Sequence, residues 1–433
     1  NNLLNAPGSV STLVQGLQGA DSINLVLVND EAQGGAGNDS IALTASGIVV
    51  STVDGGAGND TVFFNGATTY SGYTDLGAGA DSIAIVSSAT ITGGDIFGGE
   101  GNDTVRLQNA ITNTTVGAGS SADILSFTAA AAAAVTTSLV FGGKQQDTIN
   151  FLGGNVTGAT ASIGGGKGND VISLTGAGAM TLTNIGGGQG SDAISTGAAA
   201  AASVSGGGLG DTITLAGTAG FGGGVVYGDG VGVTTKGTGV GGAADGNDTI
   251  SSVAGATAAF SIYGGGGTDT INIRSGLGTG GGTGAIIDGG NGHDSINFAG
   301  SGAITSFVFG TVNGGAGADT INFGSAIQAV LNGTSLGTIA GGAGSDRLIF
   351  NMSAQAAVNS TVANSTKSQF SINAVISGGT GDVIRIENIS NGAGIASAMT
   401  AANWNTTTSV ANVWVASTLS SLTSSLSLAG RAT

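Results

Sequence analysis

The sequence predicts an all-β protein, a right-handed parallel β-solenoid of about 16–17 coils. Three observations support this fold. An aspartate that follows a glycine-rich turn recurs sixteen times, most neighbouring copies lie 18 to 27 residues apart, and each copy leads into alternating apolar and small polar residues. A fixed period of this length is typical of stacked-repeat architectures, in which each unit contacts only its neighbours.

The glycine-rich turn is the first element of each repeat. Its clearest copies are GGAGNDSIAL, Gly34 to Leu43, and GGAGNDTVFF, Gly55 to Phe64. Glycine tolerates positive φ angles and carries no side chain, so the carbonyl groups of such a turn can bend toward a common point. The recurring aspartates are Asp21, Asp39, Asp60, Asp81, Asp103, Asp123, Asp147, Asp170, Asp192, Asp211, Asp248, Asp269, Asp294, Asp319, Asp346 and Asp382.

A short strand is expected after each turn. The residue two positions after the aspartate is apolar in all sixteen copies, and the residue four positions after it fails only at Thr196 and Ser252. This period of two predicts a strand with one buried face. The mean spacing of about 22 residues suits a coil of two short strands and two corners. The opposite wall is expected from stretches such as Ile48-Val49-Val50, Ala89-Thr90-Ile91 and Leu139-Val140-Phe141.

The extent of the repeat predicts the domain organisation. Residues 1–384 are expected to form the solenoid, with loop-like expansions near 217–245 and 351–370, where the spacing lengthens. Asp229 lies in the first expansion and is interpreted as a degenerate copy of the motif. Residues 385–433 carry both tryptophans and are expected to form a C-terminal cap, an assembly segment or a truncated continuation.

The composition excludes several classes of function. The chain has 26 acidic and nine basic residues, a formal charge of -17, one histidine and no cysteine. This charge disfavours binding to nucleic acids and to anionic lipids, and no apolar run is long enough to insert into a membrane. His293, in GGNGHD, is interpreted as a repeat variant. Because no catalytic constellation accompanies it, we do not expect an enzyme.

The turns are candidate calcium sites. Calcium prefers six to eight carbonyl and carboxylate oxygens, and two turns stacked in successive coils can supply them together. The predicted ligands are the sixteen aspartates and the turn glycines Gly35, Gly37, Gly56, Gly58, Gly99, Gly101, Gly166, Gly168, Gly290, Gly292, Gly315, Gly317, Gly342 and Gly344. Asp54, Asp75 and Asp288 lie six residues before a motif aspartate and are candidates for additional carboxylate ligands.

The sites are not expected to be equivalent. Four copies lack the glycine two positions before the aspartate, and their sites are expected to be weak or empty: Asp123, Asp147, Asp211 and Asp382. Eight or nine divalent ions would neutralise the formal charge of -17, which predicts partial occupancy. The alternative is that the aspartates only accept hydrogen bonds in their own turns. That role would tolerate asparagine or serine, which none of the sixteen positions has.

The G-G-x-G-x-D copies resemble the nonapeptide repeats of the RTX proteins (repeats-in-toxin, hemolysin-type calcium-binding), over roughly Gly16 to Ile384. The resemblance implies a parallel β-roll that binds multiple Ca²⁺ ions between glycine-rich turns. Typical members repeat the motif twice in each coil. This chain has one good copy in each coil, so calcium is expected to line one edge and to leave the other edge free.

These features predict a secreted structural protein at the cell surface or outside the cell. We expect it to fold on binding calcium and to assemble with copies of itself into a surface layer, sheath or filament. RTX-like proteins include bacterial S-layer proteins of similar composition, and the resemblance implies secretion by a type I system. A cell-surface polysaccharide is a further candidate partner. The main alternative is the repeat or spacer region of an RTX adhesin, followed by the repeat part of an RTX toxin or enzyme.

Overall fold

Parallel β-strands make up the regular structure of the chain. The computed structural model describes residues 3–5, 13–26, 29–44, 48–49, 51–66, 69–85, 90–128, 134–158, 160–177, 180–181, 184–197, 199–200, 203–216, 224–230, 246–252, 261–274, 285–298, 309–324, 337–351, 374–377, 383–387 and 412–415. Over these ranges all regular elements are strands, and no helix of a length and apolarity suited to crossing a membrane occurs. The chain divides into two compact units, Asn1–Asp211 and Thr212–Thr433.

In the first unit, the strands that follow the motif aspartates form one parallel sheet, here called the motif sheet, together with one strand that precedes the first of these aspartates. Equivalent residues of successive coils lie side by side, as Ile23 pairs with Ile41 and Ile41 with Val62. The strands are β1 (Leu3–Asn5), β3 (Ser22–Leu25), β5 (Ser40–Leu43), β8 (Thr61–Phe64), β11 (Ser82–Ile85), β14 (Thr104–Leu107), β17 (Ile124–Phe127), β20 (Thr148–Phe151), β23 (Val171–Leu174) and β26 (Ala193–Thr196).

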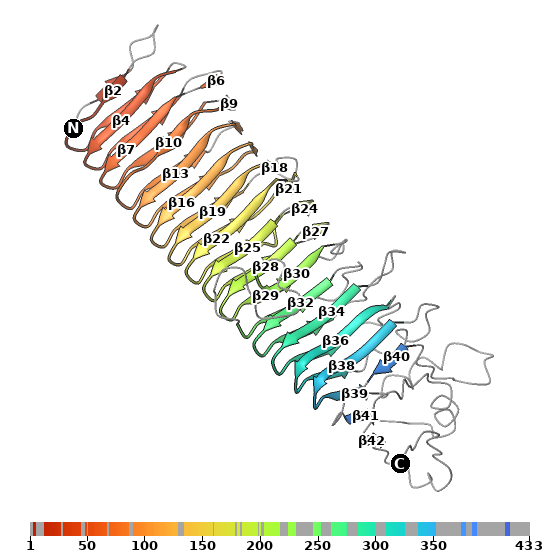
Figure 1. Cartoon of the computed structure of the whole chain (residues 1–433). Helices are drawn as coiled ribbons and strands as arrows, with labels where there is room; N and C mark the ends of the chain where they lie inside the picture. The colour runs from red at the N-terminus through yellow and green to blue at the C-terminus, as the bar shows by residue number, and fades with distance from the viewer. Residues whose placement is uncertain are drawn as a thin grey trace, which may run out of the picture. The chain divides into compact units, whose positions relative to one another are not determined.

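The strands that lead into the turns form a second parallel sheet of this unit, here called the entry sheet (Figure 1). Each runs directly into the glycines of its turn, so the turn joins the entry sheet to the motif sheet. The strands are β2 (Leu13–Gln15), β4 (Glu31–Ala36), β7 (Thr52–Ala57), β10 (Tyr73–Asp75), β13 (Asp95–Glu100), β16 (Thr115–Ser120), β19 (Leu139–Lys144), β22 (Ser162–Lys167), β25 (Asn184–Gln189) and β28 (Ser203–Gly208).

A third, 8-stranded parallel sheet completes the coils of the first unit. The prediction of two strands in each coil was therefore wrong for this unit. Ile48-Val49 and Thr90-Ile91 belong to the third sheet, whereas Leu139-Val140-Phe141 lies in the entry sheet. The strands are only two or three residues long: β6 (Ile48–Val49), β9 (Thr69–Tyr70), β12 (Thr90–Thr92), β15 (Ile111–Thr112), β18 (Ala134–Thr136), β21 (Asn155–Thr157), β24 (Met180–Thr181) and β27 (Ala199–Ala200).

The second unit contains the same two principal sheets. Its motif-sheet strands are β29 (Thr212–Leu215), β31 (Thr249–Ser252), β33 (Thr270–Ile273), β35 (Ser295–Phe298), β37 (Thr320–Phe323), β39 (Arg347–Asn351), β41 (Val383–Glu387) and β42 (Asn412–Val415). Its entry-sheet strands are β30 (Val225–Asp229), β32 (Ser261–Gly266), β34 (Ala285–Asn291), β36 (Phe309–Gly317), β38 (Gly337–Gly344) and β40 (Ala374–Ser377). The predicted parallel β-solenoid with one motif turn in each coil is confirmed.

The predicted boundary at residue 384 does not coincide with the end of the parallel sheet. Strand β41 crosses the boundary, and β42 pairs with it in parallel, with Ile384 beside Val413. The sheet therefore continues after the last motif aspartate, Asp382, which lies outside the described residues. The expansion predicted at 351–370 also lies outside them, apart from Asn351 at the end of β39.

The apolar core follows from the alternation along the strands. In the motif sheet the residues two and four positions after the aspartate point inward, and Ile41, Val62 and Ile83 are completely buried. Equivalent side chains stack in ladders, as the rings of Phe127 and Phe151 do, with centroids 4.3 Å apart and nearly parallel planes. The two exceptions in the sequence pattern, Thr196 and Ser252, keep this inward position and are buried as well.

Removing one ring from this ladder should destabilise the fold. Phe151 is 1% exposed, so Phe151→Ala leaves a cavity and should lower the free energy of unfolding by about 3–5 kcal/mol. Leu152→Ala is the matched control, because Leu152 is the next residue in the chain and its side chain is 63% exposed. Urea unfolding at one fixed calcium concentration measures both. Equal effects of the two substitutions would contradict the inward assignment of Phe151.

Candidate metal centre

Most of the described turns contain two residues with positive φ, four and two positions before the motif aspartate. In one clear copy these are Gly35 and Gly37, with φ of 100° and 135°. The three described copies that lack the second glycine keep this conformation, since φ is 94° at Ser121, 68° at Gln145 and 67° at Leu209. The backbone of these turns is thus retained, although a non-glycine residue there is strained by about 1–2 kcal/mol.

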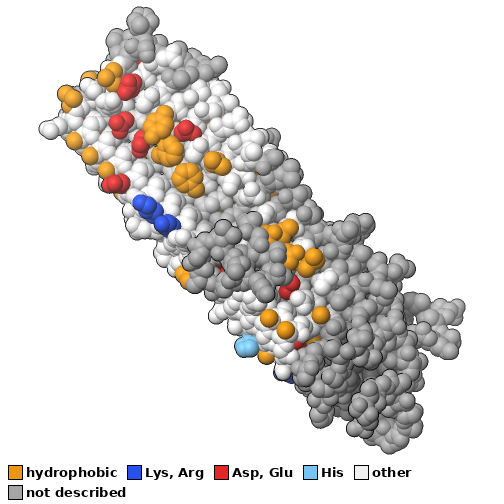
Figure 2. All heavy atoms as spheres, in the orientation of Figure 1, with side chains coloured by type: hydrophobic (Ala, Val, Ile, Leu, Met, Phe, Trp, Pro, Cys, Tyr) orange, Lys and Arg blue, Asp and Glu red, His pale blue; other side chains and the backbone are white. Residues whose placement is uncertain are grey.

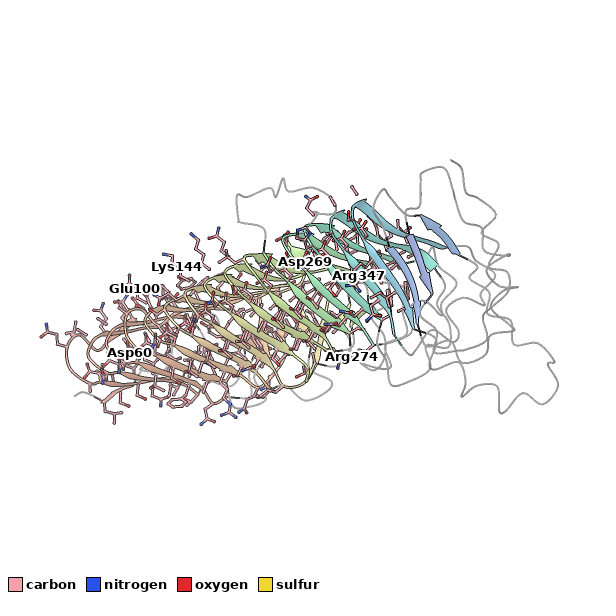
Figure 3. The ribbon with its side chains drawn as sticks, turned by 90° about the horizontal axis from the view of Figure 1, so that it is seen from below. Asp60, Glu100, Lys144, Asp269, Arg274 and Arg347 are labelled. Carbon is pink, nitrogen blue, oxygen red and sulfur yellow. The ribbon has the colours of Figure 1, made fainter. Side chains whose placement is uncertain are left out.

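The motif aspartates form a ladder of side-chain to backbone hydrogen bonds along the stacked coils. The Asp39 N–H donates to Asp60 Oδ1 at 2.7 Å, and the Asp60 N–H donates to Asp81 Oδ1 at 2.6 Å. The same contact joins Asp147 to Asp170 and, in the second unit, Asp269 to Asp294. The side chains are almost completely buried, between 0% and 3% exposed for the described motif aspartates. Figure 3 marks Asp60 in the first unit and Asp269 in the second.

A second ladder runs beside the first and was not foreseen from the sequence. The residue before the aspartate accepts a backbone N–H from the next coil, as Asn38 Oδ1 does from Asn59 at 2.9 Å. His293 takes the same role through Nδ1, which accepts the Ala318 N–H at 2.8 Å. The interpretation of His293 as a repeat variant agrees with this placement. The recurring Asn-Asp pair in the sequence is the signal that could have revealed this ladder.

The other carboxylate oxygen, Oδ2, lies beside the residue five positions before the aspartate. Where this residue is glycine, Oδ2 is close to the place that a Cβ atom would occupy. A Cβ atom built on Gly34 would lie 2.6 Å from Asp39 Oδ2 and 2.3 Å from the carbonyl oxygen of Gly55 in the next coil. At Gly187 the corresponding distances are 2.2 Å to Asp192 Oδ2 and 2.4 Å to a carbonyl oxygen. A carboxylate and a carbonyl from successive coils therefore converge at the glycine five positions before the aspartate.

The same arrangement occurs in the second unit. A Cβ built on Gly289 would lie 2.6 Å from Asp294 Oδ2 and 2.4 Å from the carbonyl oxygen of Gly314. Two coils of the first unit differ, because Leu76 and Ala118 take this position before Asp81 and Asp123, and both side chains are buried. The position five residues before the aspartate is a determinant that the sequence analysis did not single out.

Many of the buried Oδ2 atoms lack a hydrogen-bond donor. Among the described residues, none donates to the Oδ2 of the following aspartates: Asp39, Asp60, Asp81, Asp103, Asp123, Asp147, Asp170, Asp192, Asp269, Asp294 and Asp319. An ionised carboxylate that is buried without compensation is strongly unfavourable. The column therefore needs protons or cations to balance its charge.

The pKa values of the aspartates reflect this burial. Burial raises the pKa of Asp60 to about 7, the N–H donated by Asp39 partly opposes the shift, and the neighbouring carboxylates Asp81 and Asp39 raise it further. Burial is also the largest cause at Asp269, whose pKa is raised to about 8. The pKa is raised to about 7 at Asp103, Asp147 and Asp319, and to about 6 at Asp123, Asp192 and Asp294.

The additional carboxylates predicted six residues before a motif aspartate lie on the other face of the entry sheet. Asp54 and Asp75 are partners in register on its outer face, where Asp54 is exposed. Asp288 occupies the same position in the second unit and accepts a hydrogen bond from Asn313 Nδ2 at 3.1 Å. The alternation of the strand separates these carboxylates from the inward-facing glycine beside them.

Asp229 is not a degenerate copy of the motif aspartate, and that interpretation was wrong. It is in register with Gly265 at the second glycine of a turn, because Tyr227 pairs with Tyr263 two residues earlier. Asp229 Oδ2 accepts the Gly266 N–H at 2.7 Å. Gly228 takes the inward glycine position for Asp248, whose Oδ2 would lie 2.2 Å from a Cβ built there. The expansion is thus inserted within one turn, and its residues 231–245 lie outside the described part.

Carboxylates alone do not build a metal site here. In the described part of the chain, no group of three or more His, Cys, Asp or Glu side chains is placed to hold a metal ion. A cation at these turns would need backbone carbonyl oxygens as well as aspartates, which is the mixed oxygen ligand set that calcium takes. The carbonyls that converge on the Oδ2 atoms provide such donors.

Comparisons with known proteins give no family assignment. No family model matches the chain, and no curated protein matches it. One similar solved structure is the X-ray crystal structure of a hyperactive, Ca²⁺-dependent, β-helical antifreeze protein from an Antarctic bacterium. The match has 16% sequence identity and a TM-score of 0.32, and it covers 93% of this chain and 90% of that chain. Similarity at this level says nothing about what this chain binds, so the resemblance to RTX proteins rests on the motif itself.

A methyl group at the inward glycine should disrupt the turn. A Cβ on Gly165 would lie 2.3 Å from Asp170 Oδ2 and 2.5 Å from the carbonyl oxygen of Gly187. We expect Gly165→Ala to lower the free energy of unfolding by about 1–3 kcal/mol, as overpacking does. Gly164→Ala is the control, because its Cβ meets only one atom, at 4.0 Å. Thermal unfolding compares the stability of the two variants. If Gly164→Ala lowered the stability as much as Gly165→Ala, the space at the two glycines would not explain the effect.

Acid should stabilise the chain when calcium is absent. The ordinary pKa of 3.8 rises to about 7 at Asp60, so the folded state binds more protons than the unfolded state between pH 4 and 7. Stability is therefore greatest below pH 4 and is lost as the pH rises toward 8. We expect the urea midpoint of the calcium-depleted chain to fall steadily from pH 4.5 to pH 7.5. A midpoint that rises over this range would contradict the raised pKa values.

Proposed function

We propose that the chain is a calcium-binding β-solenoid that folds when calcium binds and serves as a self-assembling structural protein outside the cell. The observation that carries this proposal is the column of buried aspartates. Each described member has an almost fully buried carboxylate, and eleven of their Oδ2 atoms have no donor among the described residues. A divalent cation is the partner that such a column needs.

The residues present fit calcium. We infer that each ion is held by Oδ2 of one aspartate and by turn carbonyls of the same and the next coil, since these oxygens converge at the inner glycine, as at Gly34 and Gly55. When bound, calcium supplies positive charge beside carboxylates whose burial otherwise favours their protonation. The turns that precede Asp81 and Asp123 have a side chain at this position, so we propose that these two sites are weak, in addition to those expected at Asp147 and Asp211.

Calcium binding and folding are coupled in this proposal. The ligand oxygens of one ion come from turns about 20 residues apart in sequence, so the unfolded chain has no preformed site. A ligand that binds only the folded state stabilises it by mass action. In a calcium-poor cell interior the carboxylates would repel one another, and the chain would stay unfolded until it is secreted, by a type I system, into surroundings rich in calcium.

A structural role is favoured because the stacked coils account for nearly all the described residues and no catalytic group stands out among them. The spacer of an adhesin would use the same calcium-dependent fold. The two roles differ in assembly, since a layer, sheath or filament needs contacts between copies and a spacer does not. A cell-surface polysaccharide stays a candidate partner for either role.

Calcium should induce the β-structure, and the charge of the column should be the reason. We expect circular dichroism at pH 7.5 to show an unfolded chain after chelation and a cooperative gain of β-structure on addition of millimolar calcium. Asp170→Asn keeps the acceptor for the Asp147 N–H but removes one charge. It should therefore retain the fold in calcium, bind fewer ions and gain less stability from calcium than the wild type.

Asp54→Asn is the matched control for this variant. It removes the same charge from an exposed position on the outer face of the entry sheet, so its calcium stoichiometry should equal that of the wild type. If the aspartates act only as hydrogen-bond acceptors, Asp170→Asn will respond to calcium as the wild type does. β-structure that survives chelation at pH 7.5 would refute the coupling of folding to calcium.

A further inference from the structure

The outer face of the entry sheet in the first unit carries an aromatic row. The rings of Tyr73 and Phe97 lie 5.7 Å apart, and those of Phe97 and Phe141 lie 6.4 Å apart. Tyr73 is 43% exposed, and Leu139, three strands away on the same sheet, is 47% exposed. Figure 2 shows these apolar side chains gathered on one face of the molecule, among acidic side chains and beside a basic pair.

The row is built around a glycine. Phe97, Gly117 and Phe141 are in register in the successive strands β13, β16 and β19. A Cβ on Gly117 would lie 2.5 Å from Phe141 Cε2 and 3.1 Å from Phe97 Cδ1, so both rings lean over this glycine from opposite sides. The local surface is thus nearly symmetric about Gly117, with one phenylalanine in the coil before it and one in the coil after it.

The two halves of the face beyond these rings differ in size. Before Phe97, the same outward column holds Asp54 and Asp75. After Phe141, it holds Gly164 and Gly186, which leave a bare shelf of backbone. A Cβ on Gly164 meets one atom, at 4.0 Å, and a Cβ on Gly186 meets one, at 3.4 Å, so neither glycine is required by the fold of its own coil.

The two halves also differ in charge. Glu100 lies at the exposed end of β13, and Lys144 and Lys167 lie at the equivalent positions of β19 and β22. Ser120 is the residue between Glu100 and Lys144 in this register, in the same strand as Gly117. Figure 3 shows Glu100 and Lys144 along the same edge of the first unit.

We propose that this face is the contact through which two copies of the chain pair face to face, with their coils stacked in opposite directions, about a two-fold axis that runs along strand β16 at Gly117. Such an axis places each coil before Gly117 opposite the coil equally far after it. Phe97 of one copy then faces Phe141 of the other copy. Glu100 of one copy likewise lies opposite Lys144 of the other.

The same axis makes the halves complementary in shape. It places Asp75 opposite the bare backbone at Gly164, and Asp54 opposite that at Gly186, so the bulky half of one copy meets the shelf of the other. Seven strands, β7 to β25, would give a contact of roughly 600–700 Å² per copy, at the low end of specific interfaces. This size suits a weak contact that becomes effective when repeated in an assembly. The pairing rests on the proposed structural function and identifies the contact that assembly would use.

A charge-swap cycle tests the pairing in the full chain at millimolar calcium. We expect sedimentation to show a reversible dimer of the wild type at tens of micromolar protein. Glu100→Lys or Lys144→Glu alone brings like charges together and should weaken pairing at least tenfold, whereas the double variant should restore it. Gly164→Gln fills the shelf and should abolish pairing, while Ser173→Gln on the motif sheet is the control that leaves it unchanged.

A cross-link tests the position of the axis, because the chain has no native cysteine. Thr115 lies in the same strand as Gly117, two residues before it, so Thr115→Cys should join to its own copy through a short bis-maleimide. Thr52→Cys should join only to an Asn184→Cys chain. Circular dichroism on the same samples reports whether the chain folds with calcium. It therefore separates the proposal of calcium-coupled folding from the proposal of pairing. A chain that folds with calcium but stays monomeric, pairs only on a polysaccharide, or is not rescued by the double swap would overturn the pairing and leave the calcium proposal standing.

Discussion

The repulsion between carboxylates stacked once in every coil is the constraint on which the rest of the structure depends. Parallel strands lie about 4.8 Å apart, and two unit charges at that distance repel by about 3.5 kcal/mol at an effective dielectric constant of 20. The ladder of N–H groups donated to Oδ1 offsets part of this repulsion, as between Asp39 and Asp60. The remaining charge must be balanced by protons or by cations at Oδ2. The raised pKa values of Asp60 and Asp269 show that the buried carboxylates favour the protonated form.

This constraint accounts for the distribution of glycine. In most coils the position five residues before the aspartate is glycine, and a carboxylate and a carbonyl occupy the space that its Cβ would take, as at Gly165. The two positions with positive φ are needed by the turn itself, yet Ser121, Gln145 and Leu209 show that side chains can adopt that conformation. Packing and backbone conformation therefore act on different glycines of the same motif. The apolar ladders of the strands hold the turns in register.

The sequence predicted the parts of the fold that depend on local periodicity. The inward residues after the aspartate, such as Ile41 and Leu43, repeat with a period of two in every copy and are buried. The third sheet was missed because strands such as β24 and β27 have two residues, too few to show a period. The role of Asp229 was missed because its turn is completed across an insertion, which only the register with Gly265 reveals. The inner glycine was not singled out because a sequence shows that glycine recurs there but not which atoms occupy the space beside it.

Calcium ions in the turn column, between successive aspartates, would provide the charge that balances the buried carboxylates. A crystal structure of the calcium-loaded chain, with anomalous scattering measured for calcium, is the decisive measurement. We expect a line of anomalous peaks about 4.8 Å apart, each beside Oδ2 of a motif aspartate and a carbonyl at the inner glycine, with the weakest peaks at Asp81 and Asp123. A folded chain with no peaks along this column, or with water in their place, would show that calcium does not occupy the turns.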